Sequence, residues 1–365
     1  MKKLSIWGGI VLVILVVGMF FIRQQKVDTD ITSKQTKVGM VLIGEKEDHS
    51  WGQSHYEGME KSAKELNLLV EYEECVPENE ECIQVMEEMI EDGCKIICCN
   101  SFGYGPYIEE VAQRHPDIYF FHATGVTTSH NLSTYFGRIY QMRYLSGIVA
   151  GLQTQTNELG YVAAFNMSEV NRGINAFTLG AKSVNPDITV HVSFINSWLD
   201  DEKTEEITNE LLEAHPEIDV IAMHTDSLKA LEIAEEKGIW SIGYNVDNSN
   251  LFPNTYLTAP VWNWDSFYTP YILSCLQGKF TQNNYWLGAE TGVVRLAPLT
   301  DNVNPKAKGA VEDAYLKLKS GSFDVFYGPI KDNTGVIRVE AGDCMADETL
   351  LNEFDWFVEG VEIDE

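Results

Sequence analysis

The chain has 365 residues, 44% of them hydrophobic, and a formal net charge of −29. This length allows two domains of ordinary size, and the apolar content excludes a disordered chain. The strong negative charge repels phosphate backbones and argues against nucleic-acid binding.

Residues 1–27 predict a membrane anchor. Lys2 and Lys3 precede an uncharged run, 4–22, that is long enough to cross a bilayer as a helix. Basic residues ahead of the run favour a cytoplasmic N-terminus, so the rest of the chain is expected on the extracytoplasmic face of the cell membrane. A cleaved signal peptide is the alternative, although no small-x-small cleavage site is obvious. Polar residues 28–36 are expected to form a short tether.

Seven cysteines, an odd count, do not suggest a full disulfide framework. Cys75 and Cys82 flank a turn and are the only pair with a fair chance of bonding, although two free thiols are favoured. Cys98 and Cys99 lie in an apolar run, where cysteine usually behaves as a small hydrophobe. Because there is no CxxC motif, and no histidine at ligand spacing beside a cysteine, neither a metal nor a cofactor is expected.

Short apolar runs alternate with amphipathic stretches from residue 37 onward. Runs without clean alternation are typical of strands buried on both faces of a parallel sheet. The predicted strands of the first half are 37–44, 67–75, 95–103, 117–125 and 132–139, and the predicted helices are 54–66, 79–92 and 106–114.

The second half repeats this order. Its predicted strands are 159–165, 188–198, 219–226, 239–247 and 256–264, and its predicted helices are 171–183, 201–214 and 227–237. Alternating strands and helices form right-handed βαβ units, so we predict an α/β protein with two doubly wound parallel-sheet lobes joined by a hinge. The first lobe is assigned to 37–157 and the second to 158–264, with 265–365 returning mainly to the first.

Aromatic and polar side chains gather where the predicted strands end. Ligands of doubly wound sheets bind beyond the carboxyl ends of the strands, so two facing lobes would form a cleft that closes by a hinge. Rings with amides and carboxylates suit a flat, polar, heteroaromatic ligand. The candidate binding residues are Trp51, Ser101, Phe102, Phe165, Asn166, Trp198, Asp226, Asn245 and Asp247.

Trp51 and Trp198 are expected to form the two walls of the ligand slot, because they follow strands of opposite lobes. The alternative for each ring is packing at the interface of the lobes. No nucleophile with an adjacent base is apparent, so no catalytic residue is assigned and an enzyme acting on nucleosides is disfavoured.

Several motifs, in this order and spacing, resemble the basic-membrane-protein family of ABC-transporter substrate-binding lipoproteins. They are Lys37-Val38-Gly39, His55-Tyr56-Glu57-Gly58, Ser101-Phe102-Gly103, Arg143 to Gly151, Gly160-Tyr161-Val162, Gly180 to Pro186, Ile242-Gly243-Tyr244 and Asp355 to Gly360. The resemblance implies a solute-binding protein that captures a purine base or nucleoside and delivers it to an ABC permease and its ATPase. A membrane-tethered sensor or regulator of the same fold, without a transporter, is the alternative.

Overall fold

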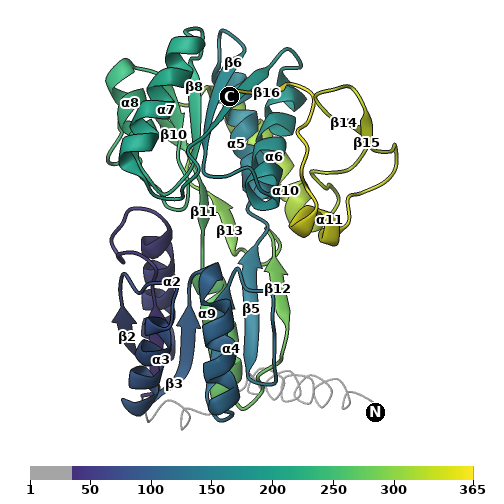
Figure 1. Cartoon of the computed structure of the whole chain (residues 1–365). Coiled ribbons are helices and arrows are strands. Elements are labelled where there is room, and N and C mark those ends of the chain that lie inside the picture. The colour runs from purple at the N-terminus through teal and green to yellow at the C-terminus, as the bar shows by residue number, and fades with distance from the viewer. Residues whose placement is uncertain (1–34, 365) are drawn as a thin grey trace, which may run out of the picture.

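The computed structural model describes residues 35–364, so the predicted anchor and most of the tether lie outside the described residues. Within the described range, no helix is both long and apolar enough to cross a bilayer. The chain forms two α/β lobes placed one above the other, with a slender β connection between them (Figure 1). Two doubly wound parallel-sheet lobes were predicted, and this part of the prediction is confirmed.

The first lobe is built on a six-stranded parallel sheet in the order β12-β5-β4-β3-β1-β2. Its inner strands are buried on both faces, which explains their unbroken apolar sequences. The strands are β1 (Lys37–Val41), β2 (Leu69–Glu73), β3 (Cys94–Cys99), β4 (Tyr119–Ala123), β5 (Leu132–Gly137) and β12 (Asn284–Leu287). The helices are α2 (Trp51–Leu66), α3 (Glu81–Glu91), the short 3₁₀ helix η1 (Phe102–Tyr104), α4 (Gly105–Arg114) and α9 (Asp265–Leu276).

The second lobe has the same design, with a parallel sheet in the order β10-β9-β8-β6-β7-β16. Its strands are β6 (Glu158–Ala163), β7 (Thr189–Phe194), β8 (Val220–His224), β9 (Trp240–Ile242), β10 (Tyr256–Thr258) and β16 (Val361–Ile363). Its helices are α5 (Tyr140–Gln153), α6 (Ser168–Val184), α7 (Asp201–Ala214), α8 (Lys229–Lys237) and α10 (Pro305–Ser320). Asp200 caps α7 by accepting from the Lys203 N–H, and left-handed Gly238 ends α8.

The chain passes between the lobes at three places. It crosses from β5 to α5, from β10 to α9, and from β12 to α10. On the last two crossings β11 (Pro260–Trp262) and β13 (Val294–Leu296) pair antiparallel and form the central connection (Figure 1). A paired ribbon joining two rigid lobes is a suitable hinge.

The segments that return after residue 264 divide between the lobes. Helix α9 and strand β12 lie in the first lobe, as expected for 265–365. By contrast, α10 packs against α5, and β16 extends the second sheet beside β7, where the apolar Val361 and Ile363 flank Glu362. Helix α5, assigned by sequence to the first lobe, packs against α6 of the second. Helix α11 (Asp347–Asn352) and the hairpin of β14 (Ile330–Lys331) and β15 (Ile337–Val339) project beside the second lobe (Figure 1).

Helices α5 and α6 approach until their backbones touch. A Cβ added at Gly180 would lie 1.9 Å from the carbonyl oxygen of Tyr144, and one at Gly147 would lie 2.0 Å from that of Phe177. Only glycine fits at such distances. The two glycines therefore set the position of α5, the first helix after the β5 crossing, against the second lobe.

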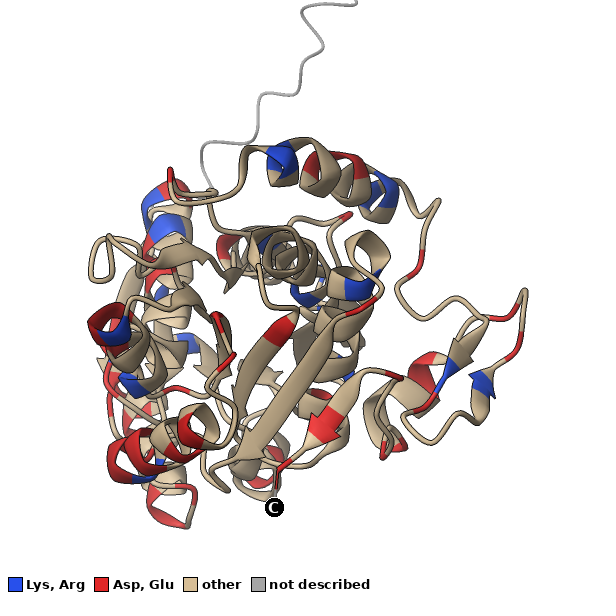
Figure 2. Cartoon of the chain, turned by 90° about the horizontal axis from the view of Figure 1, so that it is seen from above, with Lys and Arg blue, Asp and Glu red and all other residues tan. Residues whose placement is uncertain are grey.

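The acidic residues are spread over the outer helices and loops of the described chain, with Lys and Arg interspersed (Figure 2). This distribution is that of a solvated acidic surface. Cys75 and Cys82 are free, and Cys82 is fully buried in the core of the first lobe.

Candidate ligand-binding site

The carboxyl ends of both sheets face each other at the lobe interface, where a polar cluster joins the lobes. Ser50, directly before α2, donates its hydroxyl to Asp226 Oδ1 at 2.9 Å. Asn245 Nδ2 donates to the same carboxylate oxygen at 2.7 Å and to Ser50 Oγ at 2.8 Å. A further contact runs from Asn248 Nδ2 to the carbonyl of His49, 3.0 Å away. These hydrogen bonds link the first loop of one lobe to two strand ends of the other.

Asp48 fixes the shape of the loop that carries Ser50. Its carboxylate accepts from the backbone N–H groups of Ser50, Gly52 and Gln53 at 2.8–2.9 Å. This satisfies the donors at the start of α2, which would otherwise have no partner. The position of the Ser50 hydroxyl is therefore set before the lobes meet.

Aromatic rings line the first-lobe side of this interface and the hinge. The Trp51 indole N–H donates to the carbonyl of Asn100 at 2.8 Å, and its ring packs edge-on against Trp262 at 5.6 Å. Trp262 in turn stacks on Trp264 at 4.7 Å and donates its N–H to Asn245 Oδ1 at 2.7 Å. Asn245 is therefore held from both sides, by the hinge and by Asp226.

The second lobe contributes its own rings. Phe165, after β6, meets Trp198, after β7, edge-on with centroids 5.9 Å apart. Trp198 also lies 6.1 Å from the ring of His224, and its carbonyl accepts from the Asp226 N–H at 2.7 Å. This aromatic pair is thereby attached to the loop that carries Asp226.

Burial at the interface shifts the ionisation of Asp226. Burial, reinforced by the negative charge of Asp48, raises the pKa of the Asp226 carboxyl to about 7, although the Ser50 and Asn245 hydrogen bonds act in the opposite direction. Burial also raises the pKa of Glu169, on the first turn of α6, and nearby Arg172 opposes this shift. Near neutral pH the Asp226 carboxyl can therefore donate as well as accept a hydrogen bond.

Two buried arginines near Glu169 have donors to spare. Arg143 lies with its guanidinium 4.1 Å from the centroid of the Tyr244 ring and donates to the Met223 carbonyl, but its Nε and Nη2 have no partner. Arg172, on α6, lies near Phe136 of the first lobe, 5.9 Å from the ring centroid, and its Nε also lacks a partner. Unpaired buried donors of this kind are costly and favour an acceptor-bearing partner at the site.

The structure brings together part of the set predicted from sequence. Trp51, Asp226 and Asn245 meet at the interface, and Phe165 and Trp198 pair on the second lobe. The two tryptophan rings contact different groups. Trp51 packs against Trp262 of the hinge, and Trp198 lies near His224 of the second lobe.

Four predicted residues lie in other surroundings. The Ser101 hydroxyl donates to Glu78, and Phe102 is 63% exposed. Exposed Asn166 accepts from Asn171, and exposed Asp247 accepts from the Ser249 N–H of its own turn. Contact of these four residues with a ligand stays a prediction.

Sequence reasoning missed Ser50, Phe136, Glu169 and Arg172. Ser50 directly precedes Trp51, and Phe136 lies near the end of the predicted strand 132–139, so the strand-end criterion could have found both. Glu169 and Arg172 belong to α6 and not to a strand end, and no local pattern marked them.

The model of the family of PnrA-like ABC transporter substrate-binding proteins matches residues 35–320. The chain belongs to this family. The resemblance noted from sequence motifs is thereby confirmed, and the two-lobed chain with polar and aromatic groups at its interface is a substrate-binding protein of an ABC transporter family.

Two relatives match most of the chain, and their names differ in ligand. A purine-binding protein of Brucella abortus (strain 2308) is 35% identical over 331 residues, 90% of this chain and 93% of that protein. A putative ABC transporter glucose-binding protein, TsgA13, of Haloferax volcanii is 36% identical over 324 residues, 88% of this chain and 79% of that protein. Identity alone therefore does not choose between the two ligand classes.

A solved structure supports the fold independently. The crystal structure of a transcriptional activator of the comK gene from Bacillus halodurans superposes with a TM-score of 0.70 at 25% identity, covering 79% of this chain and 99% of that chain. The same two-lobed fold thus occurs in a protein named for regulation.

Proposed function

We propose that the chain binds a purine base or nucleoside between its lobes, without transforming it, and delivers it to an ABC permease and its ATPase. The observation that carries this proposal is the meeting of Asp226, Asn245 and Ser50 at the lobe interface, with aromatic rings on both sides. A purine offers two flat faces and an edge that carries both donors and acceptors, which such a site would match.

The chemistry of the polar groups favours a heteroaromatic edge over a ring of hydroxyls alone. An amide such as Asn245 can donate and accept at once, and a carboxyl with a pKa of about 7 can do either. The unpaired guanidinium donors of Arg143 and Arg172 would suit the ring nitrogens or carbonyl oxygens of a purine. The name of the Brucella relative supports the same ligand class.

A panel of ligands tests the proposal on the full chain. Thermal shift with purine bases, purine nucleosides and glucose should show stabilisation by a purine, since a ligand at a hundred times its Kd stabilises by about 2.7 kcal/mol. A response to glucose alone would replace the proposal with the ligand class named for the Haloferax relative.

Trp198→Ala tests the aromatic wall of the site. Loss of a stacking ring should weaken purine binding by roughly 1–3 kcal/mol in calorimetry. Trp356→Ala is the matched control, because that indole packs on Phe354 in the C-terminal segment, and its affinity should equal that of the wild type. Unchanged affinity in folded Trp51→Ala and Trp198→Ala variants would exclude the stacking model.

We propose further that residues 1–27 anchor the chain with its lobes on the extracytoplasmic face. The motivation is the basic start and the uncharged run 4–22. Protease added to intact cells should then degrade the lobes, and a mature N-terminus near residues 22–30 in mass spectrometry would exclude the anchor.

A tethered sensor is the second candidate, favoured by the similarity to the comK activator. It uses the same binding site but needs no permease. Uptake of labelled purine separates the two functions, because deletion of the gene should abolish uptake for a transport receptor and leave it intact for a sensor.

A further inference from the structure

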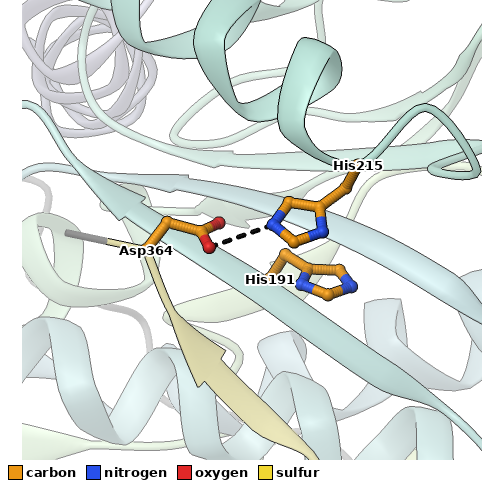
Figure 3. A group of neighbouring side chains, drawn as sticks. All are labelled: His191, His215 and Asp364. Atoms are coloured by element: carbon orange, nitrogen blue, oxygen red, sulfur yellow. Dashed lines mark hydrogen bonds and ion pairs between the residues drawn. The ribbon is translucent and has the colours of Figure 1, made fainter.

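A second group of titratable side chains lies on the sheet of the second lobe, near the start of β6 and β7. This place is away from the carboxyl ends of these strands, which form the interface. His191 is on β7, His215 directly follows α7, and Asp364 directly follows β16. Figure 3 shows the three side chains facing one another. One ligand atom from each lies within 4.8 Å of the other two.

The register of the strands adds two carboxylates to this group. Glu362 pairs with His191 across β16 and β7, so the two side chains share one face of the sheet. Glu158 stands on β6 two residues before Gly160, which pairs with His191 on the other side, and so shares the same face. The rings of His191 and His215 stack on each other at 3.7 Å.

The hydrogen bonds leave Nδ1 of His191 without a partner. Its Nε2 lies 2.7 Å from Glu158 Oε2, and an ionised carboxylate can only accept, so Nε2 carries the proton. In a neutral imidazole Nδ1 is then an acceptor. His191 is only 5% exposed and its Nδ1 has no hydrogen-bond partner; Glu362 Oε2 is 3.6 Å away. One oxygen of Asp364, Oδ2, is also buried without a partner.

The charges around the two histidines are unbalanced. The carboxylates of Glu158, Glu362 and Asp364 lie against histidine nitrogens, and within residues 35–364 none of them pairs with Lys or Arg. A cation among them would offset carboxylate repulsion in a chain that already carries −29.

We propose that this group is a binding site for a divalent transition metal of the Zn²⁺ class. The ligands are His191 Nδ1, His215 Nε2, an Asp364 carboxylate oxygen and Glu362 Oε2, a nitrogen and oxygen set that Zn²⁺ accepts in tetrahedral geometry. The metal takes the place of the proton between His215 Nε2 and Asp364 Oδ1, now 3.0 Å apart. The two rings now stack, so they must tilt out of that arrangement before both nitrogens can point at one ion at bond lengths of about 2 Å.

Glu158 acts as a positioning residue for this site. Metal-bound histidines commonly donate their second N–H to a carboxylate, which fixes the ring and its tautomer. Glu158 already holds His191 in this way. The bound metal would join β7, the end of α7 and the C-terminal strand β16, so its role is structural and independent of the ligand between the lobes.

Calorimetry on the full chain, freed of metal with a chelator, tests the proposal with Zn²⁺ as the probe. One Zn²⁺ per chain should bind, and Mg²⁺ and Ca²⁺, which prefer all-oxygen sites, should not compete. His191→Asn and His215→Asn should abolish stoichiometric binding. Glu158→Gln should retain the site with affinity lowered about 10–100-fold.

His115→Asn is the matched control. His115 follows α4 and precedes a proline as His215 does after α7, and its Nε2 also contacts a carboxylate, Glu87 at 2.7 Å. No second histidine is grouped with it among the described residues. This variant should keep wild-type Zn²⁺ affinity.

Equal Zn²⁺ affinity in the wild type and in folded His191→Asn and His215→Asn variants would overturn the proposal, as would the absence of stoichiometric binding. The residues would then be a hydrogen-bonded clamp on β16. If the histidine variants do not fold, Asp364→Asn, at a partly exposed side chain, provides the decision. Wild-type Zn²⁺ affinity in that variant would equally overturn the site.

Discussion

The environment of Asp226 differs strongly from that of a surface carboxylate. Its pKa rises from 3.8 to about 7, first through burial and then through Asp48. Because the folded chain holds this proton more tightly than the unfolded chain, the stabilising contribution is complete below pH 4 and is lost as the pH rises to about 7.

Asp226→Asn should remove this part of the pH dependence. With about 1.4 kcal/mol per pKa unit, the wild type should lose on the order of 2–4 kcal/mol relative to the variant between pH 4 and 7. Denaturant unfolding at several pH values measures the difference. Asp247→Asn, at an exposed carboxylate in the next strand-end loop, should keep the wild-type profile. Parallel profiles for the wild type and Asp226→Asn would show that Asp226 does not titrate in this range.

At the scale of elements, the contact of α5 with α6 is the most sensitive to added volume. Gly180→Ala would place a methyl group 1.9 Å from the Tyr144 carbonyl oxygen, so the helices must separate. Overpacking of this kind typically lowers the free energy of unfolding by about 1–3 kcal/mol. Urea unfolding of the ligand-free chain measures it.

Gly309→Ala on α10 is the control for that substitution. A Cβ there meets nothing within 4 Å. Since alanine is the better helix former by up to about 1 kcal/mol, this variant should be more stable than the wild type. If Gly180→Ala were as stable as Gly309→Ala, helices α5 and α6 would be able to move apart without a loss in the free energy of unfolding.

Elements with a strong local signal could be predicted from the sequence, and those defined by distant contacts could not. The predicted helix 201–214 coincides with α7, because an aspartate cap and a following His-Pro pair mark its ends. The predicted strand 256–264 is divided at Ala259 into β10 and β11, which join different sheets. Strand β16 has only three residues, and it forms because they pair with the edge of β7.

The candidate site follows the same division. Trp51, Asp226 and Asn245 could be found because strand ends of a parallel sheet converge wherever the chain places them. Glu169 and Arg172 were missed because a helix residue reaches the interface only through the packing of the whole helix. The metal-site proposal depends on three chain segments that meet only in the folded second lobe, so histidine spacing along the chain could not reveal it.

At the scale of the whole molecule, the Ser50–Asp226 hydrogen bond acts between the lobes. It forms only when the two strand-end surfaces are in contact, whereas Asp226 and Asn245 belong to one lobe and keep their own bond when the lobes separate. The hydroxyl of Ser50 therefore favours the closed arrangement of the ligand-free chain.

Ser50→Ala should shift the ligand-free chain toward an open arrangement. An ordinary hydrogen bond contributes about 0.5–1.5 kcal/mol, so the ratio of open to closed molecules should rise about 2–13-fold. Small-angle scattering should show a larger radius of gyration for the variant, and a saturating ligand should restore closure if it binds between the lobes as proposed. Ser183→Ala, which removes a bond inside α6, should scatter as the wild type does. An unchanged radius in ligand-free Ser50→Ala would mean that closure is held by other contacts, such as the Asn248–His49 hydrogen bond and the hinge ribbon, and not by the Ser50 hydroxyl.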